Sequence, residues 1–298
     1  MIVDGIFAGG GVKAFAFVGA LQVMEQRGFQ FDRLAGTSAG AIVAALIKAG
    51  YTSNEIFKLL DELDVESFKD ERMSVLPFTI AKWVHMYYRL GLYKGNALEA
   101  WLKKVLGAKG IRTFGDLPTG SLRIIASDLS KGKLLVLPDD LGKYGLIPER
   151  FPVARAIRMS CSIPFFFEPV KIYDRGNGGE ASYIVDGGLL SNFPMWLFMD
   201  GNLKRWKRPA IGFHLKPELS EIPPKKIKNA ITLYRALFET MTSAHDLRYV
   251  DSADEKNVVF IPVLDVKATD FELSDEQKDN LVTIGKKETK HFLKNWSY

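Results

Sequence analysis

An α/β fold with a mostly parallel central sheet flanked by helices is predicted by three observations. Short apolar runs typical of buried strands alternate with longer stretches typical of helices, and the first four elements run strand, helix, strand, helix. Glycine clusters stand where a strand gives way to a helix. The 298 residues, 47% of them hydrophobic, suffice for one large core, and no Pro/Ser-rich linker divides them, so we expect a single domain over residues 1–298.

The individual elements follow from the apolar pattern and from capping residues. Gly28 is expected to end the first helix, and Thr52 or Ser53 to cap the third. Residues 130–132 (Ser-Lys-Gly) are typical of a hairpin turn. In chain order the expected strands cover residues 2–8, 31–35, 122–126, 133–137, 165–170, 183–185, 211–215 and 258–263. The expected helices cover residues 12–27, 39–50, 52–63, 96–106, 152–159, about 226–250 and 274–296.

The composition excludes several classes of protein. Cys161 is the only cysteine, which rules out an intrachain disulfide and a multi-cysteine metal site and fits a reducing compartment. The longest uncharged run, residues 34–47, is too short to span a bilayer, and the first residues lack the pattern of a signal peptide. We therefore expect a cytoplasmic protein whose contact with membranes is at most peripheral.

A net charge of +5 leaves two interpretations open. The excess lies in basic runs such as residues 204–208 and 225–228. A solvated surface explains these runs, and attraction to anionic lipid headgroups is the alternative. No nucleic-acid binding motif accompanies them, so nucleic acid is not an expected partner.

Residues 73–90 combine many aromatic and aliphatic side chains with few charges. A core helix explains this composition. The alternative is a lid or lipid-contacting element, in which exposed aromatic side chains would meet an acyl substrate.

A serine between two glycines stands at the junction of the second strand and the helix that follows it. Gly36-Thr37-Ser38-Ala39-Gly40 fits the G-x-S-x-G nucleophile elbow, in which a sharp turn exposes the serine hydroxyl beside the N–H groups of a helix amino end. Glycines at Gly36 and Gly40 tolerate the backbone angles and close approach that such a turn demands. The alternative is that Ser38 simply caps the helix.

Three consecutive glycines, Gly9-Gly10-Gly11, follow the first strand. Their N–H groups can converge on an anion, as in the oxyanion hole that stabilises the tetrahedral intermediate of acyl transfer. The alternative is a dinucleotide site, because Gly9-x-Gly11-x-x-Ala14 fits a permissive G-x-G-x-x-G/A pattern with Asp32 downstream. That pattern does not explain Ser38.

Asp186-Gly187-Gly188 ends a later strand, at the sheet edge where α/β proteins place their active sites. An ordinary Asp-Gly turn is the alternative, but beside a nucleophile elbow Asp186 becomes a candidate base. A Ser-His-Asp triad would need one of the histidines to join it. None stands in a typical catalytic loop, and the elbow comes too early in the chain for the usual α/β-hydrolase. The histidines are His85, His214, His245 and His291.

Taken together and in this order, the three glycine-rich motifs resemble those of the patatin-like phospholipase family. Further stretches are also similar, and the resemblance spans nearly the whole chain. Ala14 departs from the family pattern, which usually has glycine there, and residues 73–90 match no family motif. The supporting stretches are residues 126–129, 154–169, 188–194 and 269–271.

The resemblance implies a three-layer patatin-like fold and a serine lipid acyl hydrolase of the phospholipase A or lysophospholipase type. Ser38 would be the nucleophile and Asp186 the base of a dyad without histidine. Gly10, Gly11 and Ala39 would form the oxyanion hole, with a lipid or acyl ester as substrate and no metal or cofactor. Supporting roles would fall to the motif residues Gly9, Lys13, Gly36, Gly40, Gly187 and Gly188.

An ordinary aspartate, with a pKa of ~3.9, is a weak base for a serine hydroxyl. The dyad therefore requires that Asp186 lies near Ser38 and is shielded from water, which would raise its pKa. We expect activity to rise with pH through the titration of one carboxylate, without an imidazole step.

Overall fold

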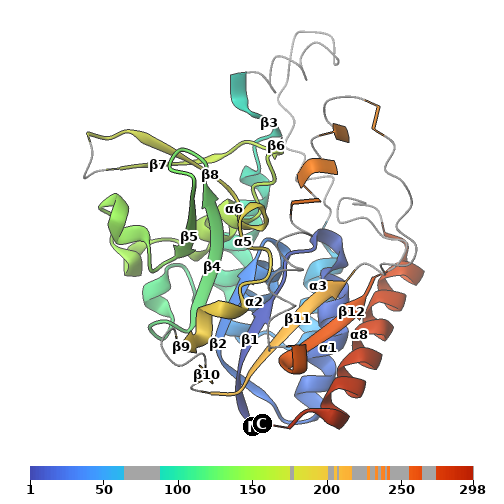
Figure 1. Ribbon diagram of the computed structural model, residues 1–298. Coiled ribbons are helices and arrows are strands. Elements are labelled where there is room, and N and C mark those ends of the chain that lie inside the picture. The colour runs from blue at the N-terminus through green and yellow to red at the C-terminus, as the bar shows by residue number, and fades with distance from the viewer. Residues whose placement is uncertain are drawn as a thin grey trace.

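The computed structural model describes residues 1–63, 88–174, 178–200, 205–206, 208–216, 227–228, 232–233, 236–238, 240–241, 255–263 and 273–297. Within these ranges the chain forms a central sheet of eight strands. Helices pack against this sheet (Figure 1). The predicted helix 226–250, residues 73–87 of the proposed lid segment and the stretch 269–271 lie largely or wholly outside the described residues. His85 and His245 lie outside them as well.

The strand order of the sheet is β12-β11-β1-β2-β4-β8-β7, with β5 paired to β4. The strands from β12 to β4 are parallel to one another, whereas β8, β7 and β5 join antiparallel. The prediction of a mostly parallel sheet flanked by helices is confirmed. The bounds are β1 Ile2–Phe7, β2 Gln30–Thr37, β4 Leu122–Asp128, β5 Lys133–Leu137, β7 Val170–Tyr173, β8 Ala181–Asp186, β11 Ala210–Lys216 and β12 Val258–Pro262.

The main helices pack against one face of this sheet and form the larger hydrophobic core with it. Alternate residues of each strand point to that face, as Phe213 and Leu215 of β11 do. The other face carries a smaller cluster around Phe193 and Phe198. The helices are α1 Phe15–Gln26, α2 Ala39–Lys48, α3 Ser53–Asp61, α5 Asn96–Ala108, α6 Val153–Ser160 and α8 Asp275–Asn295.

Most predicted elements are present, with three local differences. The first helix is preceded by a 3-10 turn, Gly11–Ala14, because Gly11 takes a positive φ of 57°. The expected strand 165–170 is divided into β6, Phe165–Phe167, and β7, because β6 pairs with β3, Gly91–Tyr93, whereas β7 pairs with β8. Helix α5 continues through Gly107. Two further short strands, β9 Met199–Asp200 and β10 Arg205–Trp206, pair with each other.

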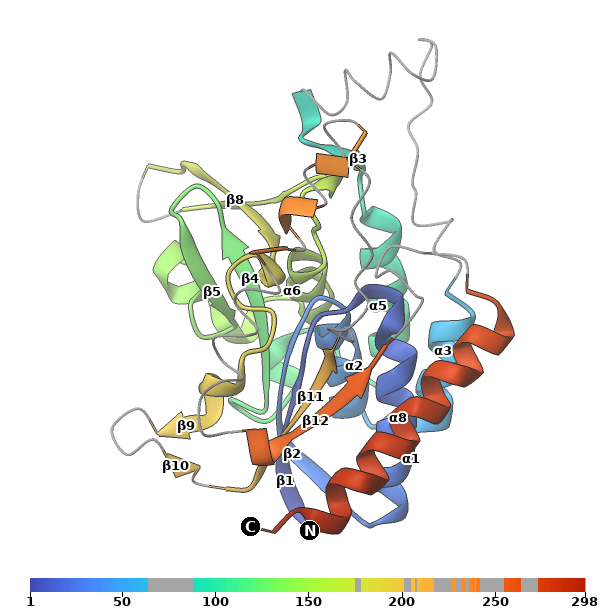
Figure 2. The ribbon, with the colours of Figure 1, turned by 45° about the vertical axis from the view of Figure 1, so that its right-hand side comes forward.

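Helices α1 and α8 lie side by side, from opposite ends of the chain, as Figures 1 and 2 show. Two glycines permit this contact. A Cβ atom at Gly19 of α1 would collide with the carbonyl oxygen of Val282, and one at Gly285 of α8 with that of Ala16. The two backbones therefore approach more closely than any side chain would allow.

We predict that Gly19→Ala lowers the free energy of unfolding by about 1–3 kcal/mol, because the added methyl must push α8 away from α1. Gly107→Ala is the matched control, since a Cβ atom at this helical position meets no atom within 4 Å. That control should be neutral or stabilising by up to about 1 kcal/mol. Thermal denaturation of both variants checks the prediction, and equal melting temperatures would contradict it.

Candidate active site

Ser38 stands alone between β2 and α2 in a strained backbone conformation. Its φ of 52° and ψ of −125° are unusual for a residue with a side chain and cost on the order of 1–3 kcal/mol. The flanking glycines make the turn possible by close packing. A Cβ atom at Gly36 would collide with the carbonyl oxygen of Gly40, and one at Gly40 with the carbonyl oxygens of Phe7 and Ala8 at the end of β1.

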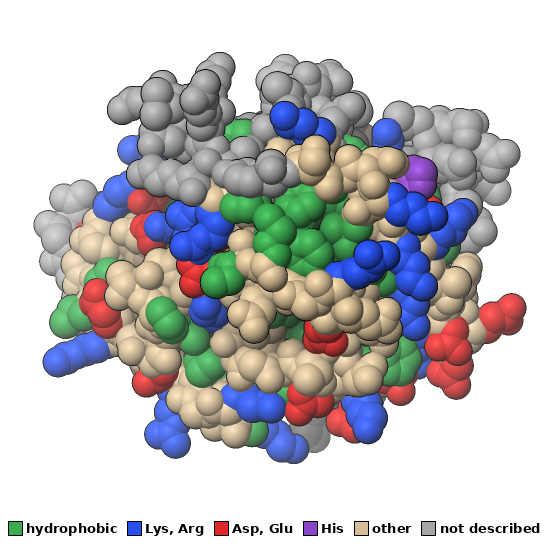
Figure 3. Space-filling model, turned by 90° about the horizontal axis from the view of Figure 1, so that it is seen from below, with side chains coloured by type: hydrophobic (Ala, Val, Ile, Leu, Met, Phe, Trp, Pro, Cys, Tyr) green, Lys and Arg blue, Asp and Glu red, His purple; other side chains and the backbone are tan. Residues whose placement is uncertain are grey.

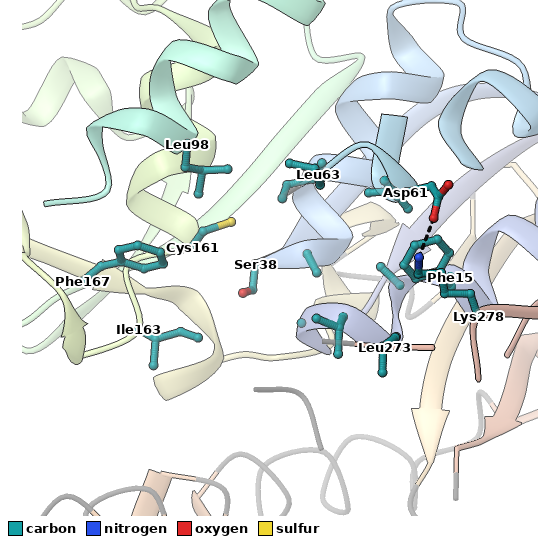
Figure 4. Close-up of a pocket in the computed structure, with 16 residues that line it drawn as sticks. Phe15, Ser38, Asp61, Leu63, Leu98, Cys161, Ile163, Phe167, Leu273 and Lys278 are labelled. Atoms are coloured by element: carbon teal, nitrogen blue, oxygen red, sulfur yellow. Dashed lines mark hydrogen bonds and ion pairs between the residues drawn. The ribbon is translucent and has the colours of Figure 1, made fainter. Parts of the chain in front are cut away.

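The hydroxyl of Ser38 does not cap helix α2. Ser38 occupies the N-cap position, but its side chain accepts no hydrogen bond from the first turn. Its backbone instead holds the turn, because its N–H donates to Ser160 Oγ at 2.8 Å and its carbonyl accepts from the Ala41 N–H at 2.9 Å. The capping interpretation is therefore wrong for the side chain, and the hydroxyl points into a cavity (Figure 4).

Asp186 ends β8 and is buried, with 2% of its surface exposed. Its Oδ1 atom accepts a hydrogen bond of 2.7 Å from the Gly188 N–H. Its Oδ2 atom has no hydrogen-bond partner among the described residues. Burial raises the pKa of Asp186 to about 7, and the Gly188 N–H and the Ser38 hydroxyl offset only part of this rise. The serine hydroxyl is thus near the carboxylate without a formed hydrogen bond, as is common before substrate binds.

This raised pKa changes what a pH profile can reveal. An unperturbed imidazole titrates near 6.5, close to the value of the buried Asp186 carboxyl. The expected carboxylate step therefore falls where an imidazole step would appear. The midpoint alone does not distinguish a dyad from a triad, whereas substitution of the histidines does.

Neither described histidine belongs to the site. His214 lies on β11 between the rings of Phe193, at 5.0 Å, and Phe260, at 5.9 Å, on the face opposite the larger core. His291 lies exposed on α8. Of these two histidines, neither lines the cavity that contains Ser38.

The dinucleotide alternative fails on the position of Asp32. This residue lies near the amino end of β2 and pairs with Arg208, whereas the glycine loop follows the carboxyl end of β1. Strands β1 and β2 are parallel, so the two features lie at opposite edges of the sheet. A ribose held by Asp32 and a pyrophosphate held by Gly9 to Gly11 would not belong to one nucleotide.

The glycine loop lies against the elbow. The Gly9 N–H donates to the Asn192 carbonyl at 3.1 Å, and a Cβ atom at Gly9 would lie 3.4 Å from that of Ser38. In the described part of the chain, the N–H groups of Gly10, Gly11 and Ala39 donate to no acceptor. Gly11 and Ala39 line the cavity with Ser38, whereas Gly10 does not. Lys13 lies half-buried in the 3-10 turn that follows.

The cavity has a volume of about 340 Å³ and a mainly apolar wall. Figure 4 shows Leu98, Cys161, Ile163 and Phe167 on one side of Ser38. On the other side lie Leu63, Phe15 and Leu273, beyond which Lys278 Nζ pairs with Asp61 at 2.6 Å. The apolar space on both sides of the hydroxyl is suited to hydrocarbon chains.

Cys161 beside Ser38 is a part of the site that the sequence did not reveal. Burial raises the pKa of its thiol well above the ordinary value, with a further contribution from the charge of Asp186. The thiol therefore stays protonated and is not a second nucleophile. Cys161 lies within residues 154–164, which also contribute Ile163 to the cavity. The resemblance of this stretch to the family pattern was the only feature of the sequence that pointed to Cys161.

A second hollow, of about 330 Å³, lies at the end of the molecule that carries both termini. Its lining residues include Phe29, Leu293 and Trp296 but no serine, aspartate or histidine. Figure 3 views this end and shows apolar side chains with Lys and Arg around them. The residues that line this hollow include neither a candidate nucleophile nor a candidate base.

Two features are absent from the described ranges. No group of three or more His, Cys, Asp or Glu side chains is placed to hold a metal ion. No helix in those ranges has the length and apolarity needed to cross a membrane.

Comparison with known proteins gives the family. A sequence model described as patatin-like phospholipase matches residues 5–199. The chain belongs to this family. It is 56% identical, over the full length of both chains, to the uncharacterized protein YqhO of Bacillus subtilis (strain 168). It is 29% identical to a cUMP-AMP-activated phospholipase of Escherichia coli over 62% of this chain and 54% of that protein.

A protein of known structure has the same fold. VipD from Legionella pneumophila superposes with a TM-score of 0.58 at 16% identity, covering 99% of this chain and 67% of VipD. The resemblance identified from the sequence is confirmed by the family match, and the predicted fold by this superposition.

The buried carboxyl predicts a stability that depends on pH. A carboxyl with a higher pKa in the folded protein than in the unfolded chain holds its proton more tightly when folded. Stability contributed by protonated Asp186 is therefore present below the unfolded pKa of ~3.9 and is lost as pH rises through about 7. Asp186→Asn removes the charge and keeps an oxygen for the Gly188 N–H. We expect this variant to melt above the wild type at pH 8, by an amount that shrinks towards pH 5.

Asp139→Asn is the control for this comparison. Its carboxylate is partly exposed and pairs with Arg123, so its replacement should produce no such pH-dependent gain. The test is to measure the melting temperatures of the wild type and of both variants from pH 5 to pH 8. Equal melting temperatures for the wild type and Asp186→Asn at pH 8 would contradict the prediction, because they would show that the charged carboxylate of Asp186 does not destabilise the folded protein.

Proposed function

We propose that this protein is a serine lipid acyl hydrolase of the phospholipase A or lysophospholipase type, acting through a Ser38–Asp186 dyad. The observation that carries the proposal is the buried carboxyl of Asp186, which has one oxygen unpaired among the described residues and interacts with the hydroxyl of Ser38. Ser38 itself is strained and lines an apolar cavity. Membership of the patatin-like phospholipase family and the similarity to the Escherichia coli phospholipase support it.

Acylation begins when Asp186 Oδ2 accepts the proton of the Ser38 hydroxyl. Ser38 Oγ then attacks the carbonyl carbon of the ester, and the carbonyl oxygen becomes an oxyanion. Protonated Asp186 returns the proton to the leaving alcohol as the carbon–oxygen bond breaks. In the second half, Asp186 takes a proton from water, which attacks the carbonyl carbon of the acyl-enzyme. As the bond from that carbon to Ser38 Oγ breaks, Asp186 returns the proton to Oγ, and the fatty acid is released.

The oxyanion would meet the N–H groups of Gly10, Gly11 and Ala39. These groups have no acceptor in the described part of the chain, and Ala39 begins helix α2, whose amino end favours negative charge. Fixed donors of this kind stabilise the transition state, and the loss of one of them typically costs about 3 kcal/mol. They are needed here because the base is a carboxylate.

The raised pKa of Asp186 makes the carboxylate a better base at neutral pH. Efficient proton transfer needs a group whose pKa lies near the working pH, and burial moves this one to about 7. Activity should therefore increase with pH as Asp186 loses its proton. No metal or cofactor is required for either half of this reaction.

We propose that the substrate is an ester of a long acyl chain. The side of the cavity formed by Leu98, Ile163 and Phe167 is apolar and accepts the acyl chain, whereas the side that ends at the Asp61–Lys278 pair is suited to the alcohol part. Residues 1–298 would act as one patatin-like domain in the cytoplasm and meet lipid at the membrane surface.

Covalent labelling tests the nucleophile. We expect a fluorophosphonate probe to add one adduct to the wild type, none to Ser38→Ala, and to react more slowly with Asp186→Asn, because only an activated serine attacks phosphorus. Intact-mass spectrometry measures each outcome. Ser121→Ala is the matched control and should leave labelling unchanged. Ser121 is buried just before β4, and its hydroxyl has no hydrogen-bond partner among the described residues. A folded wild type that remains unlabelled in lipid vesicles would favour a non-catalytic acyl-binding or nucleotide-binding module.

Replacement of the histidines separates the dyad from a Ser-His-Asp esterase. We expect His214→Gln and His291→Ala to keep kcat within a few-fold of the wild type, because neither histidine lines the site. His85→Ala and His245→Ala complete the set. Hydrolysis of a soluble nitrophenyl ester is the assay, and a loss of about 10⁴-fold in a folded variant would establish a triad.

The acyl side of the cavity can be narrowed by one substitution. Leu98→Trp should lower kcat/KM for a dodecanoyl ester at least tenfold relative to an acetyl ester, since each methylene that loses its burial costs about 0.8 kcal/mol, or roughly fourfold. Ile147→Trp, on the exposed surface, is the control and should alter neither substrate. If Leu98→Trp slows both esters equally, the chain does not bind on this side.

A further inference from the structure

Ser160 lies outside the cavity wall, yet its hydroxyl contacts the backbone of the nucleophile. It is the last residue of α6 and is fully buried. We propose that Ser160 is a positioning residue that holds Ser38 in its strained conformation and so aims the hydroxyl at Asp186. This inference rests on the proposed role of Ser38 as the nucleophile.

The two hydrogen bonds of Ser160 fix its orientation. Its hydroxyl donates to the Ile125 carbonyl at 2.5 Å, so a lone pair of Oγ remains to accept the Ser38 N–H at 2.8 Å. The donor and the acceptor roles of the hydroxyl are thus both used. An alanine at this position would leave a buried N–H and a buried carbonyl without their partner.

Ile125 is the point of the sheet at which the two halves of the dyad meet. In β4, Ile125 is the register partner of Thr37, which precedes Ser38, and Ala126 is the partner of Asp186 in β8. Ser160 therefore ties the elbow to β4, the strand along which the carboxyl ends of β2 and β8 meet.

Ser162, two residues on, holds the second member of the dyad. Its carbonyl accepts the Asp186 N–H at 2.9 Å. One short segment thus binds the backbone N–H groups of both Ser38 and Asp186, and a shift of this segment would change their relative position. Small misplacements of reacting groups are costly in rate even when the substrate still binds.

Arg158 anchors this segment from within the fold. It is 2% exposed, and its guanidinium donates to the Ser162 hydroxyl and to the Gly95 and Glu168 carbonyls, the last two at 2.8 and 2.9 Å. The segment is therefore fixed independently of Ser38, so the hydroxyl of Ser160 meets the elbow from a rigid support.

The test compares Ser160→Ala, Ser160→Thr and Ser127→Ala with the wild type, using the full chain and a nitrophenyl ester. Ser160→Ala should lower kcat and the rate of fluorophosphonate labelling by roughly ten- to hundredfold with KM within about twofold, because the cavity wall is unchanged. Ser160→Thr keeps the hydroxyl and should restore most of the rate. Ser127→Ala is the control, because Ser127 is a buried serine of β4 whose hydroxyl has no partner among the described residues. It should leave the rate unchanged.

Exchange of the Ser38 amide hydrogen, measured by NMR on labelled protein, gives a readout that does not depend on activity. This amide should be protected in the wild type and in Ser127→Ala and should exchange faster in Ser160→Ala. A folded Ser160→Ala enzyme with wild-type kcat would overturn the inference, and so would an unprotected Ser38 amide in the wild type, even if Ser160→Ala failed to fold. An inactive wild type with a protected Ser38 amide would instead remove the proposed hydrolase function.

Discussion

The exclusion of water from one carboxylate is the constraint on which the rest of the site depends. In the proposed mechanism, Asp186 is a useful base only while its carboxyl is shielded from water, since burial is the largest cause of its raised pKa. Burying this carboxyl away from water costs folding free energy. The sheet makes the burial possible, because β8 ends within the core beside β4. There, among the described residues, the Gly188 N–H donates to Oδ1 of the carboxylate. A second donor on Oδ2 would stabilise the charge and weaken the base. The unpaired Oδ2 atom is thus a requirement of the proposed mechanism.

Glycines at three positions let the loops that follow β1, β2 and β8 pack closely together. Gly40 packs on the end of β1, Gly9 packs on the side-chain oxygen of Asn192, and Gly187 approaches the Ile125 carbonyl, each at a distance that a Cβ atom would prevent. These glycines belong to three separate motifs of the sequence. Their common role is to let β1, β2 and β8 end within reach of one another, so that the proposed oxyanion donors, nucleophile and base lie close together.

The sequence predicted the parts whose cause is local. Ser38 and Asp186 were identified as candidates from their own neighbours, because a strand, a tight turn and glycines are encoded within a few residues. The break between β6 and β7 was missed, because it depends on which strand each piece pairs with. Ser160 and Cys161 were missed for the same reason: their roles come from contacts over more than 120 residues, which no local pattern records.

The position of the two chain ends has a practical meaning. Both termini lie together at the amino ends of the strands, and helix α8 returns the chain there along α1, whereas Ser38 lies at the carboxyl ends (Figures 1 and 2). A fusion partner, an affinity tag or a solid support attached to either end would therefore stand clear of the cavity. The neighbouring ends also suit the chain to circular permutation, with new ends opened in a surface loop and the old ones joined by a short linker.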